Sequence, residues 1–347
     1  MQKFSNLFEH TIGSLRLFGK MSHFLKKNEP NPSALIFSGS SHSFLAQEMS
    51  DELCLPMGKR KIGNFPDGET CLEIYEDIAH KEIFLFQSLA FLPNHFLVEL
   101  LLFIDALKKG FAKKITLILP YLGYSRQDTE GKSFFSPASK LIANLLNATS
   151  VDRIITFDLH SKKNESFFQI PVTNLHAQAL IAAEAIKHLE KPFVVVAPDF
   201  GSIPLAKRAA KILDCEIVTV CKQRIDPYKV RSTLMGEVKD KQVLLIDDIC
   251  STGSTLLAAA ELCKTSGAKK IVAGVTHGLL VENAIQKIDK SPIKLLITTN
   301  SVESLKKDAN KMVILSVAPM LKEAILRTGF REWKNPSKTL KLSVSRK

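Results

Sequence analysis

Apolar residues occur along this chain in short runs that alternate with longer stretches in which apolar positions recur every three or four residues. Short runs bounded by turn residues predict buried strands, and the longer spacing predicts helices with one core-facing side. Strands are predicted at Ser33–Gly39, Phe84–Gln87, Ile115–Leu119, Arg153–Phe157, Phe193–Ala197, Glu216–Val220, Val243–Ile246, Ile271–Thr276, Lys294–Thr298 and Val313–Val317. Helices are predicted at Phe44–Cys54, Phe96–Lys109, Ala138–Leu146, Thr173–Leu189, Pro204–Leu213, Leu256–Gly267 and Pro319–Arg327.

This alternation of strands and helices predicts a parallel α/β fold. The series starts again after Leu189, and 347 residues are too many for one small core, so we interpret the chain as two tandem domains. Each is expected to be a mainly parallel sheet flanked by helices. The expected boundaries are 1–32 for an N-terminal extension, 33–177 and 178–328 for the domains, and 329–347 for a basic tail. The last helix is a candidate to pack on the first domain.

The segment from Gln242 to Ala273 carries the clearest chemical pattern. An apolar run ends in two carboxylates, Asp247 and Asp248, and a loop of small and hydroxyl residues precedes a helix; these loop residues are Ser251, Thr252, Gly253, Ser254 and Thr255. Backbone N–H groups of such a loop and the positive end of a helix can hold a phosphate. The carboxylates suit sugar hydroxyls or a hard metal ion. Alternatively, the two acids merely end a strand and cap a helix.

Two further segments place polar groups where a ligand could meet them. A hairpin is predicted over Lys59–Ile78, with Phe65 at its root, where Phe65 could stack on a base while Asp67 and Glu69 accept hydrogen bonds. A plain surface hairpin is the alternative. Arg126, Gln127 and Asp128 follow a buried strand at its carboxyl end, where open α/β sheets bind ligands, although a solvated loop would also explain them.

Other strands of the predicted sheets are also followed by charged or ionisable side chains. His160 comes directly after Asp158-Leu159 at a strand end, and Asp199 follows the strand of the second domain. His160 is a plausible metal ligand, although a lone histidine is more often structural. Lys222 and Arg224 alternate on a polar connection long enough to be a flap, so both would point to one side and could neutralise a transferred phosphoryl group.

Composition narrows the partners and the compartment. An apolar fraction of 45% and a charged fraction of 24% are typical of a globular protein. The net charge of +12 suits phosphate-rich small substrates. The sequence contains no basic block interleaved with aromatic residues, so nucleic acid is not expected as a partner. Six scattered cysteines without a C-x-x-C pair indicate free thiols rather than a disulfide frame or a zinc site. With no apolar run long enough for a bilayer, we expect a cytoplasmic protein without membrane association.

From about Ser33 to Arg327 the chain resembles the ribose-phosphate pyrophosphokinases (phosphoribosyl pyrophosphate synthetases), which have the type I phosphoribosyltransferase fold. The acidic loop and the Lys-x-Arg pair are part of this resemblance. The other matching segments, in the family's order, are FPDGE at Phe65–Glu69, the segment Glu99–Asp128 ending in RQD, DLH at Asp158–His160, FFQIPVTNL at Phe167–Leu175, APD at Ala197–Asp199, THG at Thr276–Gly278 and LSVAPMLKEAI at Leu315–Ile325.

The resemblance implies a role for each of these residues. Phe65, Asp67 and Glu69 would meet adenine across a dimer interface, and Arg126 and Gln127 would hold ATP phosphates with Asp128 nearby. His160 and Asp199 would hold Mg²⁺ on those phosphates. Asp247 and Asp248 would bind the ribose hydroxyls, and Ser251 to Thr255 the 5-phosphate. Lys222 and Arg224 would be the catalytic cations.

The implied reaction moves the diphosphoryl group of ATP onto the 1-hydroxyl of ribose 5-phosphate, giving 5-phosphoribosyl 1-pyrophosphate and AMP. Family members usually assemble from dimers into hexamers or tetramers, so self-association is expected. Two other interpretations stay open: a catalytically weak regulatory paralogue, and a related phosphoribosyl transferase or phosphoribosyl-sensing regulator. The presence together of His160, Asp199, Lys222, Arg224 and the acidic pair favours the active enzyme.

Some positions depart from the family's pattern. The usual loop reads D-D-x-x-D-T-G-G-T, whereas Ser251 stands here for the third Asp and Ser254 for a Gly. The second change matters if the backbone at 254 needs a positive φ. Thr129-Glu130 follow Asp128, where most members have a basic residue.

Overall fold

A computed structural model describes residues 33–128, 137–226, 229–303 and 311–330, with the backbone alone for 222–226 and 229–231. All of its helices and strands belong to one compact unit that begins at Ala34. The N-terminal extension, the tail beyond Phe330 and the Thr129-Glu130 departure lie outside the described residues.

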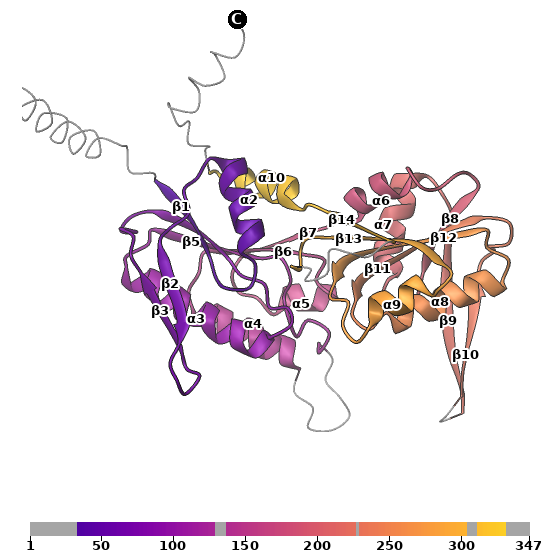
Figure 1. Cartoon of the computed structure of the whole chain (residues 1–347), viewed down its shortest axis with the longest axis horizontal. Helices are drawn as coiled ribbons and strands as arrows, with labels where there is room; N and C mark the ends of the chain where they lie inside the picture. Colours follow the sequence, from indigo (N-terminus) through magenta and orange to yellow (C-terminus); the bar gives the residue numbers. More distant parts are fainter. Residues whose placement is uncertain (1–32, 129–136, 227–228, 304–310, 331–347) are drawn as a thin grey trace, which may run out of the picture. The chain divides into compact units, whose positions relative to one another are not determined.

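The first sheet has five parallel strands in the order β1-β4-β5-β6-β7 (Figure 1). They are β1 (Ala34–Ser38), β4 (Glu82–Phe86), β5 (Lys114–Leu119), β6 (Arg153–Phe157) and β7 (Val172–Leu175). Alternate residues of β1 and β4 enter two different hydrophobic clusters, so these clusters cover opposite faces. One cluster contains α3 (Pro93–Lys109) and α4 (Ala138–Ala148), and the other contains α2 (Ser43–Leu53) and α10 (Ala318–Arg327).

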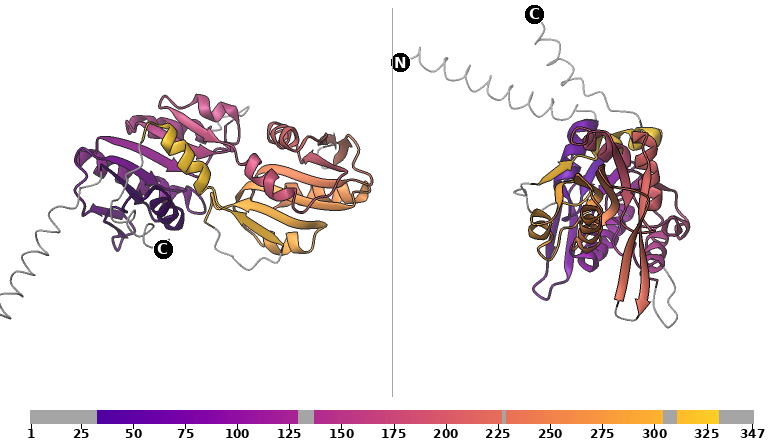
Figure 2. Two further views of the ribbon diagram at one scale, coloured as in Figure 1. Left: turned by 90° about the horizontal axis from the view of Figure 1, so that it is seen from above. Right: turned by 90° about the vertical axis from the view of Figure 1, so that its right-hand side faces the viewer.

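The second sheet has seven strands in the order β10-β9-β8-β11-β12-β13-β14, all parallel except the β9–β10 pair. They are β8 (Phe193–Ala197), β9 (Ile217–Asp226), β10 (Lys229–Met235), β11 (Gln242–Cys250), β12 (Lys270–Gly278), β13 (Ile293–Thr299) and β14 (Met312–Leu315). Helices α8 (Ser254–Thr265) and α9 (Ala284–Asp289) cover one face, and α6 (Gln178–Ala185) and α7 (Ile203–Leu213) cover the other (Figure 2).

The predicted α/β class, with two parallel sheets each flanked by helices, is therefore confirmed. Helix α10 follows the second sheet in sequence but packs on the first, against α2 and the strands. Its buried side chains, such as Leu321 and Ile325, supply the apolar contact that fixes it there. The boundary between the two domains stays a prediction.

Three sequence predictions were wrong in detail. Thr173 does not begin a helix: β7 pairs with β6, and the helix starts only at Gln178, because β-branched Val172 and Thr173 suit an extended edge strand. The strand before the acidic loop does not end at Ile246 but continues through Asp247 to Cys250, because β12 offers a backbone partner along this length.

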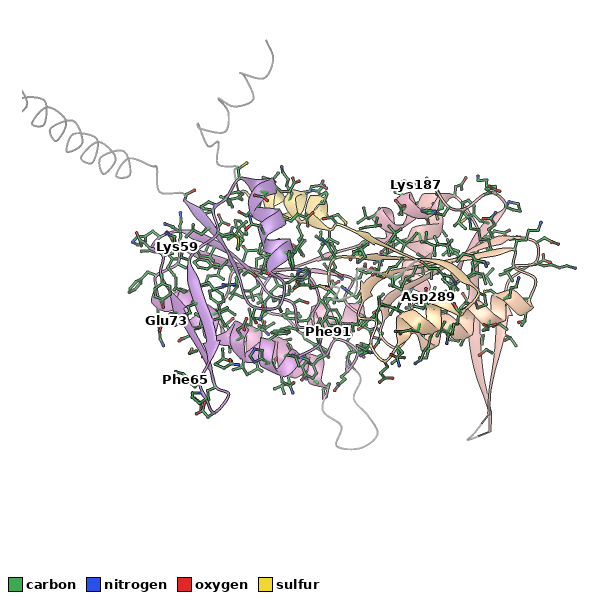
Figure 3. The ribbon with its side chains drawn as sticks, in the orientation of Figure 1. Lys59, Phe65, Glu73, Phe91, Lys187 and Asp289 are labelled. Atoms are coloured by element: carbon green, nitrogen blue, oxygen red, sulfur yellow. The ribbon has the colours of Figure 1, made fainter. Side chains whose placement is uncertain are left out.

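The third error concerns Phe65, which we expected at the root of its hairpin. Strands β2 (Arg60–Asn64) and β3 (Thr70–Ile74) pair antiparallel, and the turn between them begins at Phe65. The Phe65 N–H donates to the Glu69 carbonyl at 2.8 Å and closes the turn. Figure 3 shows Phe65 at the far end of the hairpin, where its side chain is 54% exposed.

The polar connection after Val220 also has more regular structure than a flap loop would. It forms the antiparallel β9–β10 hairpin, whose ladder runs from Lys229–Asp226 to Met235–Thr219. Figures 1 and 2 show this hairpin extending past the helices of its sheet. In the part of the chain that the structure describes, no helix is long and apolar enough to cross a membrane.

Candidate functional site

A cavity of about 600 Å³ lies where the carboxyl ends of strands from both sheets meet. Its walls come from the segments after β5, β6, β7, β8 and β11 and from the first residues of α7 and α8. This is the edge at which open α/β sheets bind ligands. Of the predicted site residues, the cavity brings together Arg126, His160, Asp199, Asp247, Asp248, Ser251, Thr252, Gly253, Ser254 and Thr255.

The loop after β11 has the geometry of an anion cradle. Gly253 has a φ of 80°, in the left-handed region that glycine adopts without strain, and it turns the chain into α8. The Leu280 N–H donates to the Cys250 carbonyl and the Val281 N–H to the Ser251 carbonyl, both at 3.0 Å, and these bonds fix the loop to the segment after β12. The Thr252 hydroxyl donates to the Ser254 hydroxyl at 3.2 Å.

This geometry explains why serine is tolerated at position 254. The residue with positive φ is Gly253, whereas Ser254 is the first residue of α8 and has no such requirement. A serine side chain is compatible with this helical position, and its hydroxyl accepts the hydrogen bond from Thr252. The departure from the family's loop at Ser254 therefore leaves the cradle intact.

The carboxylates of Asp247 and Asp248 are nearly buried at the end of β11, with exposed fractions of 8% and 7%. Burial, and then repulsion from Asp248 and Asp199, raises the pKa of Asp247 well above its usual value. The backbone N–H of Asp248 donates to Asp247 Oδ1 at 3.0 Å. Two of the cavity's acids thus repel the third, and a cation or a set of hydroxyl donors would relieve that repulsion.

His160 joins the two halves of the site. Its Nδ1 lies 2.7 Å from Asp248 Oδ2, although the two residues are 88 positions apart. The hydrogen bond that His160 donates to Asp248 raises the pKa of His160 against the opposing effect of burial. A ligand in the cavity would therefore meet the other ring nitrogen, Nε2, with the ring held in place by Asp248.

Asp199 is held at the start of α7. Its Oδ1 accepts the Ser202 N–H at 3.1 Å, and its carbonyl accepts the Ser202 hydroxyl at 2.9 Å. Within the described residues, no three His, Cys, Asp or Glu side chains converge into a ready metal cage. Oxygen donors with unbalanced negative charge nevertheless fit a hard cation such as Mg²⁺, which proteins usually hold by one or two carboxylates while substrate phosphates complete its shell.

The side chains of the Arg126-Gln127-Asp128 segment lie in two different environments. Arg126 is exposed and lines both the main cavity and a neighbouring one of about 260 Å³, which Gln127 also lines. Asp128 is nearly buried, and its Oδ2 accepts the Ser161 hydroxyl. Arg126 and Gln127 are thus available to a ligand, whereas Asp128 holds the loop that carries His160.

The remaining predicted residues lie on the two hairpins. Phe65, Asp67 and Glu69 are exposed on the β2–β3 hairpin and do not belong to the lining of the cavity. Lys222 and Arg224 lie on β9, opposite Ser232 and Val230. The side chains of Lys222 and Arg224 are outside the described residues.

Asp158 and His176 are among the cavity residues that the sequence analysis did not propose as site residues. The Asp158 carboxylate accepts hydrogen bonds from His176 Nδ1 at 2.8 Å, the Ala177 N–H at 3.0 Å, Gln178 Nε2 at 2.9 Å and the Thr276 hydroxyl at 2.6 Å. Burial acts to raise the pKa of Asp158, but these bonds outweigh it and hold the pKa below its usual value. An acid directly after a buried strand was the available signal.

Comparisons with known proteins agree with this arrangement. A family model for the N-terminal domain of ribose phosphate pyrophosphokinase matches residues 34–149, and one for the phosphoribosyl transferase domain matches residues 171–304. Together they cover well over half of the chain.

Similar proteins match over nearly their whole length. Ribose-phosphate pyrophosphokinase A of Dictyostelium discoideum is 38% identical over 302 residues, which are 86% of this chain and 95% of that protein. The ribose-phosphate pyrophosphokinase of Rhizobium meliloti is 38% identical over 301 residues, covering 86% and 97%. The crystal structure of phosphoribosylpyrophosphate synthetase from Mycobacterium smegmatis superposes with a TM-score of 0.80 at 31% identity, over 85% of this chain and 98% of that one. The chain therefore belongs to the ribose-phosphate pyrophosphokinase family.

Proposed function

We propose that this protein transfers the diphosphoryl group of ATP to the 1-hydroxyl of ribose 5-phosphate, giving 5-phosphoribosyl 1-pyrophosphate and AMP. The observation that supports this function is that groups from both sheets line one cavity. A phosphate cradle and an acidic pair from the second sheet face Arg126 and His160 from the first sheet across a single cavity. Such a cavity can hold a sugar phosphate and a triphosphate side by side, and the names of the similar proteins describe this chemistry.

The sugar phosphate would occupy the end of the cavity that β11 and α8 form. Backbone donors and hydroxyls of Ser251 to Thr255 would surround the 5-phosphate at the positive end of α8, a helix of 12 residues. Asp247 and Asp248 would accept hydrogen bonds from the ribose hydroxyls. Because both carboxylates are nearly buried and repel each other, hydroxyl donors stabilise them more than water at a surface would.

ATP would occupy the other end, with Arg126 and Gln127 on its phosphates and Asp128 behind them. His160 and Asp199 are the residues that we assign to the Mg²⁺ on those phosphates. Bound Mg²⁺ would neutralise phosphate charge and favour attack on phosphorus. Lys222 and Arg224 on β9 would add positive charge as the transfer proceeds.

The chemical step itself needs little beyond positioning. The sugar's 1-oxygen forms a bond to the β-phosphorus while the bond from that phosphorus to the bridging oxygen of AMP breaks. AMP leaves with that oxygen, and the hydroxyl proton passes to solvent. Oriented reactants and fixed charges can supply most of the rate enhancement of such a transfer.

The hairpin residues Phe65, Asp67 and Glu69 fit this function only through self-association. Their exposed position away from the cavity of their own chain supports a role at the adenine of a neighbouring subunit in a dimer-based oligomer, a hexamer or a tetramer. We also propose the cytoplasm as the compartment, because all six cysteines are free thiols, which are typical of a reducing environment.

The test is AMP formation from ATP and Mg²⁺, measured with and without ribose 5-phosphate. The proposal predicts AMP only when the sugar phosphate is present, together with an equal amount of 5-phosphoribosyl 1-pyrophosphate. Folded protein that binds ATP but forms no AMP in either case would contradict it and favour the regulatory paralogue. AMP formed equally well without the sugar would also contradict it.

A further inference from the structure

The segment that carries His160 is joined to the second sheet by three side-chain bridges. Phe157, Asp158 and His160 follow one another at the carboxyl end of β6, and each meets a residue of β11 or β12. His277 Nε2 lies 3.2 Å from the Phe157 carbonyl, the Thr276 hydroxyl donates to Asp158 Oδ2 at 2.6 Å, and His160 Nδ1 lies 2.7 Å from Asp248 Oδ2.

Two of these bridges run side by side. In the ladder between β11 and β12, Asp247 pairs with Val275 and Ile249 pairs with His277, so Asp248 and Thr276 occupy neighbouring positions. On the other side, Asp158 and His160 are two residues apart on one segment. The Thr276–Asp158 bond and the Asp248–His160 pair therefore connect the same two stretches of backbone.

The two bridges differ in how firmly they are held. Thr276 is fully buried and Asp158 is 2% exposed, and the Asp158 carboxylate accepts four hydrogen bonds. The backbone of Asp158 has a φ of 33°, which a non-glycine residue adopts only when its surroundings impose it. By contrast, the side chain of His160 is 37% exposed. The buried bridge is thus the rigid one, and the ion pair beside it faces the cavity.

We propose that Thr276 and Asp158 are positioning residues that set His160 against Asp248, and that the threonine hydroxyl is needed for turnover rather than for folding alone. This inference rests on the proposed function. Without the hydroxyl, one oxygen of a buried carboxylate loses its donor from β12, and the Asp158–His160 segment loses a fixed distance to the acidic pair. Misplacement by about 1 Å can cost on the order of 100-fold in rate.

The test replaces Thr276 by valine, which keeps the shape and removes the hydroxyl, and by serine, which keeps the hydroxyl. Thr156→Val is the matched control, because Thr156 is also fully buried, lies on β6 and has a hydroxyl without a hydrogen-bond partner among the described residues. We expect Thr276→Val to lower kcat about tenfold or more, with little change in KM for ATP. Thr276→Ser should restore most of the rate, and Thr156→Val should stay within about twofold of the wild type.

A double-mutant cycle with His160→Gln separates positioning from general stability. If Thr276 acts through His160, adding Thr276→Val to His160→Gln lowers kcat by less than about twofold further, because the two losses overlap. An equal loss in both backgrounds would overturn the inference. So would a Thr276→Val protein that melts earlier but keeps the kcat of the wild type.

Two controls separate a folding defect or a wrong proposed function from failure of this inference. Thr276→Ala removes the same hydroxyl without adding bulk and carries the test if valine prevents folding. The wild-type protein is assayed alongside for sugar-dependent AMP. Its inactivity would refute the proposed function, whereas an active wild type with an unaffected Thr276→Val would refute this inference alone.

Discussion

Two loops of this protein have similar sequences but use their hydrogen-bond donors differently. The loop Gly39–His42 leads from β1 into α2, and the loop Ser251–Gly253 leads from β11 into α8. Both are short and rich in glycine and serine. In the first, Ser40 donates its N–H and its hydroxyl to the Glu99 carboxylate at 2.7 and 2.5 Å. In the second, the hydroxyls of Thr252 and Ser254 bond to each other and line the cavity.

The difference lies in where the negative charge comes from. Glu99 is fully buried on α3 and also accepts a hydrogen bond from Gln87 Nε2 at 2.9 Å, while Gln87 accepts from the Ser41 hydroxyl at 2.7 Å. The protein's own carboxylate thus uses the donors of the first loop, whereas the second loop would offer its donors to the proposed phosphate. We expect a small hydroxyl-rich loop after a strand to bind a ligand only where no internal acid occupies it.

The largest effect should come from Glu99→Ala. It leaves the donors of Ser40 and Gln87 unpaired in the core and opens a cavity, so the free energy of unfolding should fall by about 4 kcal/mol. Chemical denaturation measures this. Glu99→Gln, which keeps one acceptor oxygen, is the control and should lose clearly less. A loss of ribose 5-phosphate affinity without a loss of stability would make the first loop a ligand site too.

Asp248→Asn should have the second-largest effect, on function instead of stability. It removes the partner of His160 and a proposed acceptor for the ribose hydroxyls, so kcat/KM for ribose 5-phosphate should fall about 100-fold. The free energy of unfolding should change by less than about 1 kcal/mol, because the lost pair is partly exposed and repulsion on Asp247 decreases. Steady-state kinetics beside a denaturant titration checks both, and an unchanged KM for the sugar phosphate would undo the assignment.

Replacing the glycine of each loop by alanine gives a smaller, paired effect. A Cβ at Gly39 would lie 2.1 Å from Gln87 Oε1 and 2.7 Å from Glu99 Oε1, so Gly39→Ala should destabilise the protein by about 2 kcal/mol. At Gly253 the nearest atom is 3.6 Å away, and only the φ of 80° opposes alanine, at a cost of about 1 kcal/mol. Thermal unfolding of the two variants should rank them in this order. The reverse order would mean that the first loop is not tightly filled.

The smallest effect concerns thiol chemistry near the second loop. Burial raises the pKa of Cys250 and of Cys263 to about 12, so neither thiol forms much thiolate at pH 8. Iodoacetamide should leave both unmodified in the native protein and label them after unfolding, as peptide mass spectrometry can show. Rapid labelling of Cys250 in the native protein would indicate that the second loop opens and exposes this thiol.

Sequence reasoning found most of the fold because the signals were local. The apolar run Val243–Ile246 and the spacing of apolar residues on α3 indicate which residues face a core. That pattern also predicts whether a segment is a strand or a helix. The acidic loop was also identifiable, since acids, hydroxyls and a glycine at a strand–helix junction have few other uses. The extension of β11 through Asp247 to Cys250 was not, because it depends on the length of the neighbouring strand β12.

Contacts between residues that are distant in the sequence could not be predicted. Glu99 lies 59 residues from Ser40, and nothing around either residue indicates that the two meet. Likewise, the Thr276–Asp158 bond spans 118 residues, although both residues stand in segments that the sequence singled out. A loop's neighbours in space decide whether its donors are used, so the sequence around Ser40 does not show that Glu99 already accepts its hydrogen bonds.

The most direct test of this account measures ribose 5-phosphate binding by calorimetry to two matched variants, Ser251→Ala and Ser40→Ala. Each removes one serine hydroxyl from one of the two loops. Because a hydrogen bond to a charged phosphate contributes about 1.5–3 kcal/mol, Ser251→Ala should weaken binding at least about tenfold, while Ser40→Ala leaves it unchanged. Equal affinities for the two variants, or weaker binding only in Ser40→Ala, would contradict the account.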